Sequence, residues 1–137
     1  MKLLQIIVLV LMHVQAFAQI SPQLGSRSVA LGATGLLEDD VWSVYNNPGA
    51  MGRVNSNKIG VNYQNRFLLK ELSTQSIAYL QHTENSGNFG VQFQHYGFQL
   101  YREFQGGLSY ARQLGRQFYG GVSLNWHSIA LGENYGS

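Results

Sequence analysis

The side chains that could bind a metal are few in this chain and are not spaced for it. His82, His95 and His127 lie far apart and form no H-E-x-x-H or comparable zinc-ligand pattern. The acidic run at 38–40 lacks the D-x-D-x-D-G spacing of a calcium loop. We therefore expect neither a metal site nor a bound cofactor.

Motifs for nucleophilic catalysis and phosphate binding are missing as well. Ser43 and Ser109 lack the G-x-S-x-G elbow that exposes a catalytic serine. The run 32–35 is neither a G-x-G-x-x-G fingerprint nor a P-loop. The chain has no cysteine, which excludes disulfides, thiolate zinc sites and cysteine nucleophiles. The sequence predicts a protein that is not an enzyme.

The composition indicates an exported protein with little charge. Only 12% of the 137 residues are charged, about half the usual share, while 45% are apolar. Residues 1–18 are predicted to be a signal peptide, in which Lys2 precedes an apolar stretch and Ala16-Phe17-Ala18 forms the cleavage site. Removing Lys2 lowers the net charge from +2 to +1, so we expect no nucleic-acid partner.

From Lys58 onward, apolar and polar residues alternate with a period of two. This pattern is typical of strands with one apolar and one polar face, although Ala78 and Leu80 blur the second strand. Turn signals at 84–88 and 114–117 separate the strands, so residues 58–137 are expected to form an antiparallel meander of about five strands. The apolar positions that alternate are Ile59, Val61 and Tyr63; Ile77 and Tyr79; Phe89, Val91 and Phe93; Phe104, Leu108 and Tyr110; and Phe118, Val122, Leu124 and Trp126.

Two architectures fit this pattern. A soluble β-sandwich would bury the apolar face against a second sheet. An outer-membrane barrel would turn the apolar face to lipid and the polar face to its lumen. The barrel is favoured, because the polar face is rich in Gln, Asn, Ser and Gly and because aromatic residues gather near strand ends as in an interfacial girdle. We expect an all-β, antiparallel up-and-down transmembrane β-barrel. On its polar face, room for a plug or for strand bending is left by Gly60, Gly90, Gly107 and Gly121.

Residues 19–57 lack a sustained period and are expected to form an irregular or short-helical N-terminal plug. The acidic run at 38–40 favours a short helix over 41–45, because carboxylates stabilise a helix N-terminus. Asn47 and Pro48 then end that helix, and the proline restricts Asn47 to an extended backbone.

One charge pair is expected inside this segment. In a lumen, Arg27 needs a carboxylate partner, and Asp39 or Asp40 could supply it. One reading is that these residues lock the plug to itself or to the barrel wall. The other is that all three are solvated in a wide, wet lumen, where exposed pairs contribute little.

The stretch 25–52 also resembles a known family. It is similar to the opening of the PorV/PorQ-type outer-membrane barrels of Bacteroidetes, which are related to FadL-type fatty acid channels. The chain departs from the family pattern at Gly49-Ala50-Met51, where A-G-L is usual. The positions that match are Gly25, Arg27, Leu31, Gly32, Asp39, Asp40, Asn47 and Pro48.

This resemblance implies a location in the outer membrane, in contact with its lipid, and a periplasmic plug inside a barrel of about 14 strands. It implies one of two non-enzymatic roles. The chain would be an accessory of type IX protein secretion that binds secretion machinery or client proteins, or a conduit for a hydrophobic ligand. We expect the secretion role, because the stretch 25–52 is nearer to that branch. The alternative from another class is a soluble, exported β-sheet binding module.

The length also bears on how the sheet would close. Residues 58–137 leave room for about five membrane-spanning strands of 9–11 residues each. The smallest closed bacterial barrels have about eight strands, and lipid does not tolerate open sheet edges. We therefore expect the chain to be the N-terminal portion of a longer protein. Closure by several copies of the chain is the less favoured alternative.

Overall fold

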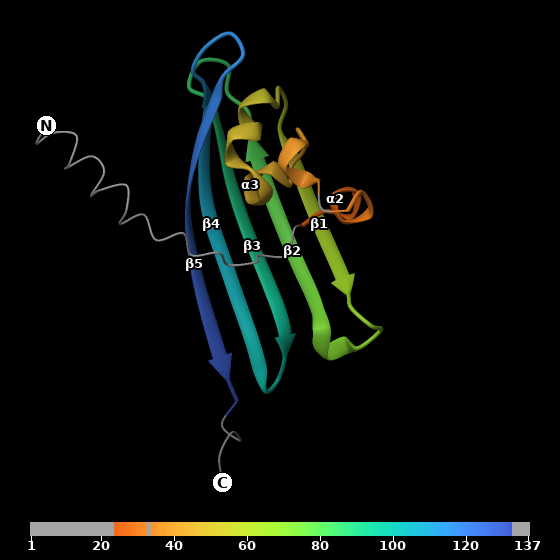
Figure 1. Cartoon of the computed structure of the whole chain (residues 1–137). Helices are drawn as coiled ribbons and strands as arrows, with labels where there is room; N and C mark the ends of the chain where they lie inside the picture. Colours follow the sequence, from red (N-terminus) through yellow and green to blue (C-terminus); the bar gives the residue numbers. More distant parts are fainter. Residues whose placement is uncertain (1–23, 33, 133–137) are drawn as a thin grey trace, which may run out of the picture.

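The computed structural model describes residues 24–32 and 34–132, so the signal peptide predicted at 1–18 lies outside the described part. Most of this part is one sheet whose five strands pair antiparallel with their sequence neighbours, and β1 and β5 form its two edges (Figure 1). The predicted all-β, up-and-down antiparallel arrangement is confirmed, as an open sheet. The strands are β1 (Lys58–Asn65), β2 (Ser73–Gln81), β3 (Asn88–Phe98), β4 (Tyr101–Gln113) and β5 (Tyr119–Leu131).

Within the described residues before Lys58, four short helical elements precede the sheet. We refer to residues 24–57 as the N-terminal segment, and it lies against one face of the sheet, towards the end at which β1 begins (Figure 1). Its elements are α2 (Ser26–Ala30), the 3-10 turn η1 (Gly35–Leu37), α3 (Ser43–Asn46) and the 3-10 turn η2 (Pro48–Arg53). A further 3-10 turn, η3 (Lys70–Leu72), lies in the loop between β1 and β2.

The helix expected at 41–45 forms slightly later, as α3. Asp40 holds the turn that precedes this helix, because its Oδ1 accepts a hydrogen bond from the backbone N–H of Trp42 at 2.8 Å. Asn47 has the extended backbone that Pro48 requires, with φ −157° and ψ 92°. The turn expected after Pro48 continues as η2, which brings further apolar residues onto the sheet.

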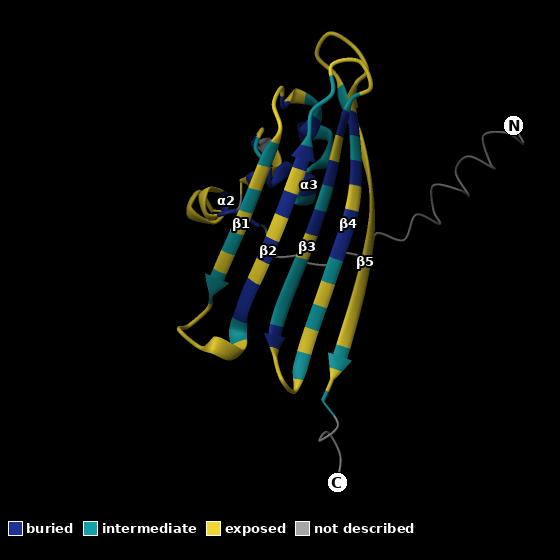
Figure 2. Ribbon diagram, turned by 180° about the vertical axis from the view of Figure 1, so that it is seen from behind, coloured by how far each residue is buried: buried dark blue, intermediate teal, exposed yellow. Residues whose placement is uncertain are grey.

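The register assigns each residue to one of two faces. On the covered face, which contacts the N-terminal segment, one row across the five strands reads Gly60, Ala78, Gln92, Gly107 and Asn125. On the opposite face, which we call the bare face, the adjacent row reads Ile59, Tyr79, Val91, Leu108 and Leu124. Figure 2 shows this reverse side of the sheet, with exposed positions recurring along the strands and with α2 and α3 behind it.

The hydrophobic core lies between the N-terminal segment and the covered face. Val44 and Met51 are fully buried there against apolar residues of the strands. Ala78 and Leu80 belong to this core, which explains why they blur the alternation in β2: they point inward, but the segment gives them an apolar neighbour.

Candidate functional site

The glycines of the covered face let the N-terminal segment approach the sheet closely. A Cβ added at Gly60 would lie 2.5 Å from Cγ1 of Val41, and one at Gly90 would lie 2.8 Å from the Val44 methyls. A Cβ at Gly121 would lie 2.6 Å from the backbone N of Gly49. Any larger residue at these positions would displace the segment. Three of the four glycines singled out in the sequence therefore form the surface against which the segment packs.

The fourth glycine of that set serves a different purpose. A Cβ at Gly107 would meet the side chains of Gln92 and Asn125, which flank it on β3 and β5. Those two side chains are joined above it by a hydrogen bond of 3.0 Å from Gln92 Nε2 to Asn125 Oδ1. Gly107 thus makes room for a polar contact across β4.

Hydrogen bonds from the strands fix the position of the N-terminal segment. Buried Asn88, at the start of β3, donates its Nδ2 to the carbonyls of Met51 at 2.5 Å and Val54 at 2.7 Å. Ser109 Oγ donates to the carbonyl of Val44 at 3.0 Å. Sequence reasoning missed these anchors, because a lone Asn or Ser at a strand position gives no sign that a distant carbonyl lies opposite it.

The residues of the predicted plug motif are structural in this fold. Gly25 has a left-handed φ of 101°, and a Cβ there would lie 2.7 Å from the Trp42 ring, so only glycine fits. Gly32 is also left-handed, with φ 74°. Asn47 accepts a hydrogen bond from the N–H of Gly49 and donates one to the carbonyl of Leu36 at 2.8 Å, which holds the backbone around Pro48.

The charges of the motif pair differently from the expectation. Arg27 meets Glu38, with 3.5 Å between Nε and Oε1, and neither Asp39 nor Asp40 takes that place. Asp39 pairs with Arg53, and Asp40 holds the turn before α3. Because three carboxylates follow one another in the sequence, the course of the backbone decides which of them pairs with Arg27, and it places the first one, Glu38, beside Arg27. The Arg27 side chain is 74% exposed, but that of Glu38 is only 8% exposed, so Arg27 is the ion-pair partner of a largely buried carboxylate.

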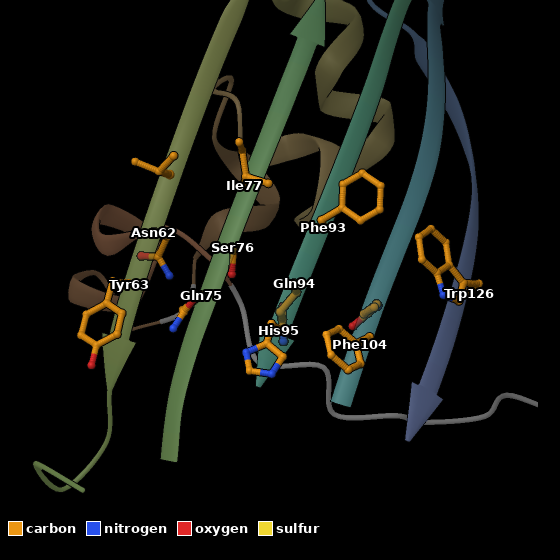
Figure 3. Close-up of a pocket in the computed structure, with 12 residues that line it drawn as sticks. Asn62, Tyr63, Gln75, Ser76, Ile77, Phe93, Gln94, His95, Phe104 and Trp126 are labelled. Atoms are coloured by element: carbon orange, nitrogen blue, oxygen red, sulfur yellow. The ribbon is translucent and has the colours of Figure 1, made fainter. Parts of the chain in front are cut away.

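The bare face is apolar over its whole middle. Val61 is 77% exposed and Leu124 is 75% exposed, although both belong to regular paired strands. An open groove of about 760 Å³ crosses this face, and Figure 3 shows side chains that line it. Within it, the rings of Phe93 and Trp126 stand edge to face with their centres 5.4 Å apart.

Strand β4 orders its bare-face side chains by polarity. Alternate positions read Arg102, Phe104, Gly106, Leu108, Tyr110 and Arg112, so that two exposed arginines enclose an aromatic and aliphatic centre. The arginines are ten residues apart, which corresponds to about 34 Å along the strand. A tilt of about 40° reduces this to about 26 Å, which is close to the height of the apolar band on a transmembrane barrel.

Beyond the N-terminal segment, the covered face carries a polar row and then exposed apolar residues, among them Ile129 at 53% and Leu131 at 63%. One row across the sheet reads Asn62, Ser76, Gln94, Gln105 and His127. Within the described part of the chain, the buried Ser76 Oγ and the Oε1 atoms of Gln92 and Gln94 have no hydrogen-bond partner. Water in contact with this face would supply the hydrogen bonds that these atoms lack.

The three histidines of the sheet and its turns make separate contacts. His95 packs against Phe104 with 4.8 Å between ring centres and an angle of 44° between the ring planes, and His82 contacts Asn88. His127 Nε2 lies 3.5 Å from a carboxylate oxygen of Glu103. The described residues contain no group of three or more potential ligands that could hold a metal ion. Among those same residues, no helix combines the length and apolar character needed to cross a membrane.

Comparisons with known proteins add no family to this description. No protein-family model, curated protein or solved structure matched the chain.

Proposed function

We propose that this chain forms part of the wall of an outer-membrane β-barrel, with the N-terminal segment as a plug on the luminal side. In this role the chain has no catalytic activity. The observation that carries the proposal is the inverted burial of the sheet: the apolar face is bare, and the polar face is covered. Lipid is the natural solvent for the first face, and a water-filled lumen suits the second.

A soluble sandwich would show the reverse arrangement. It would place its cover on the apolar side, because burying apolar area stabilises the fold. In this chain the core elements pack on glycine, serine and small apolar residues of the covered face instead. An exposed apolar surface spread over five strands is also far larger than the scattered apolar residues of an ordinary soluble surface.

The lengths of the strands support the same proposal. β3, β4 and β5 have 11, 13 and 13 residues, and a tilted membrane-spanning strand needs about 9–11. Arg102 and Arg112 would lie at the two membrane surfaces. There, the guanidinium groups reach the lipid headgroups while the aliphatic parts of the side chains pack on apolar surface.

The number of strands limits how such a wall can close. In a five-stranded meander, β1 and β5 run in the same direction. Copies related by rotation about a barrel axis would place β5 beside β1 of the next copy in parallel, whereas bacterial barrels are antiparallel throughout. An antiparallel barrel would therefore require an odd number of additional strands between β5 and β1.

Within this class we propose a role as a type IX secretion accessory, on the resemblance of residues 25–52 to the PorV/PorQ-type barrels. The polar row from Asn62 to His127 supports this role over a conduit for hydrophobic molecules, because hydrophobic ligands prefer apolar linings. Exposed Ile129 and Leu131 lie beyond that row on the same face.

Membrane fractionation with heat-modifiable gel migration tests the proposal. The chain should sediment with outer membranes and migrate faster in the gel before boiling than after it. A chain found wholly in the soluble periplasm would exclude the barrel. For the narrower role, deleting the gene should retain secreted proteins inside the cell. Normal secretion combined with reduced uptake of a long-chain fatty acid would instead support the conduit.

A further inference from the structure

The loop between β1 and β2 exposes more hydrophobic surface than its neighbours. Phe67 is 84% exposed and Leu68 is 93% exposed, and Leu69 beside them is half exposed. The loop lies at the end of the sheet that is remote from α3 (Figure 1). These side chains gain little from packing within the described part of the chain.

The backbone of this loop is strained at the same two residues. Phe67 and Leu68 have φ values of 59° and 57°, in the left-handed region that bulky side chains avoid. Hydrogen bonds on either side hold the loop, from Leu69 N to the carbonyl of Arg66 and from Leu72 N to that of Leu69. The residues that carry the strain are thus the ones presented outward, which suggests a partner outside the sheet.

The charges around the tip indicate what that partner is. Arg66 and Lys70 flank the apolar residues, and Glu71 follows Lys70 in η3; all three are exposed, which leaves the loop with one net positive charge (two basic residues and one acidic residue). The ion pairs found among the described residues join Arg27, Arg53 and His127 to carboxylates and leave these two basic residues out. An apolar tip between unpaired basic side chains matches a lipid surface that bears phosphates, where the rings and methyls enter the acyl boundary and the basic groups meet the headgroups.

We propose that the β1–β2 loop is an anchor that inserts into an anionic lipid surface through Phe67 and Leu68 and binds lipid phosphates through Arg66 and Lys70. Burial of the two side chains in lipid offsets the backbone strain. This inference rests on the proposed membrane location, and it adds a lipid chemistry that the barrel wall by itself does not require.

Single-tryptophan variants can test the loop separately from the wall. Trp42→Phe with Trp126→Phe and Phe67→Trp leaves one tryptophan at the tip, whereas Trp42→Phe alone leaves Trp126 on the bare face. Both proteins are mixed with phosphatidylcholine vesicles, with and without phosphatidylglycerol, that carry bromine near the headgroup or deep in the acyl chain. As a control, Asn85→Trp in a chain that carries Trp42→Phe and Trp126→Phe places the probe in the exposed β2–β3 turn at the other end of the sheet.

We expect shallow bromines to quench the tip probe and deep bromines to quench Trp126, with little quenching of the Asn85→Trp probe. Phosphatidylglycerol should strengthen insertion of the tip, and Arg66→Gln and Lys70→Gln should each weaken that effect about fivefold. A tip probe that no lipid quenches while Trp126 is quenched would overturn the anchor and leave the barrel wall standing. Unquenched Trp126 with a tip probe quenched only in phosphatidylglycerol vesicles would overturn the wall and support the anchor. Protection of the tip that grows with protein concentration, without lipid, would show that a second copy is the partner and would also overturn the anchor.

Discussion

Lysine placed at adjacent positions of β5 should have opposite consequences on the two faces of the sheet. Leu124 belongs to the bare face and Ser123 to the covered face, and both are exposed in the isolated sheet. In water alone, Leu124→Lys and Ser123→Lys should therefore be tolerated equally. In a barrel, the first lysine faces lipid and the second faces the lumen.

The register gives the size of the difference. Leu124 pairs with Leu108, which lies six residues from Arg102 and four from Arg112, so it is near the middle of the apolar band. A lysine at the bilayer midplane of a barrel costs about 2–4 kcal/mol. Since about 1.4 kcal/mol is a factor of ten, Leu124→Lys should lower the ratio of folded to unfolded chain about 30-fold to several hundred-fold. Ser123→Lys should change it little.

Urea titration of refolding into lipid vesicles, read by heat-modifiable gel migration, measures this ratio. Ala130→Lys is the matched control for depth, because Ala130 is on the same face but pairs with Arg102 at the edge of the band; its cost should be about 0–1 kcal/mol. Equal tolerance of lysine at 123, 124 and 130 would refute the lipid-facing assignment. Folding that is complete without vesicles would refute it as well.

Four further predictions concern the N-terminal segment and the loop. Gly90→Val should release the N-terminal segment from the sheet, because its Cβ would lie 2.8 Å from the Val44 methyls. A thiol introduced by Ser109→Cys beneath the segment should then react faster with maleimide. Overpacking costs about 1–3 kcal/mol, which corresponds to an increase in the labelling rate of about 5- to 150-fold. Asn88→Asp keeps the shape but removes the donor to two buried carbonyls, so the unfolding midpoint in urea should fall by the equivalent of about 1–3 kcal/mol. Arg27→Ala leaves the largely buried Glu38 carboxylate without its ion-pair partner and should lower that midpoint by the equivalent of about 1–3 kcal/mol, with pore conductance unchanged; a large conductance change would favour the lock expected from the sequence. Leu68→Asn should raise stability in detergent by up to about 1–2 kcal/mol, because Asn accepts a left-handed backbone, while it weakens lipid insertion of the loop.

The strands were predictable because one physical pattern repeats in each of them. A period of two over residues such as Phe89, Val91 and Phe93 fixes both the strand and the face that each side chain takes. Short turns then leave an antiparallel meander as the only simple arrangement. The exception was β2, where Ala78 and Leu80 follow a tertiary contact that alternation does not encode.

The turns of the N-terminal segment were predictable from the sequence, but its contacts were not. Its glycine and proline content indicated tight turns, and Asn47 behaves as the following proline dictates. Long-range partners depend on which surfaces meet after folding, so the pairing of Arg27 with Glu38 and the anchoring by Asn88 had no local signal. The strained tip at Phe67 and Leu68 was also missed, because nothing in the residue types indicates a left-handed backbone there.

The central claim is that lipid covers the apolar face of this sheet, and site-directed spin labelling tests it most directly. The chain has no cysteine, so Leu108→Cys and Leu124→Cys each provide a single attachment site on the bare face, and Ser123→Cys provides one on the covered face. In outer membranes, collision with oxygen should exceed collision with a water-soluble nickel complex at 108 and 124, and the order should reverse at 123. Labels at 108 and 124 that collide freely with nickel, or with neither reagent because a second sheet covers them, would contradict the account.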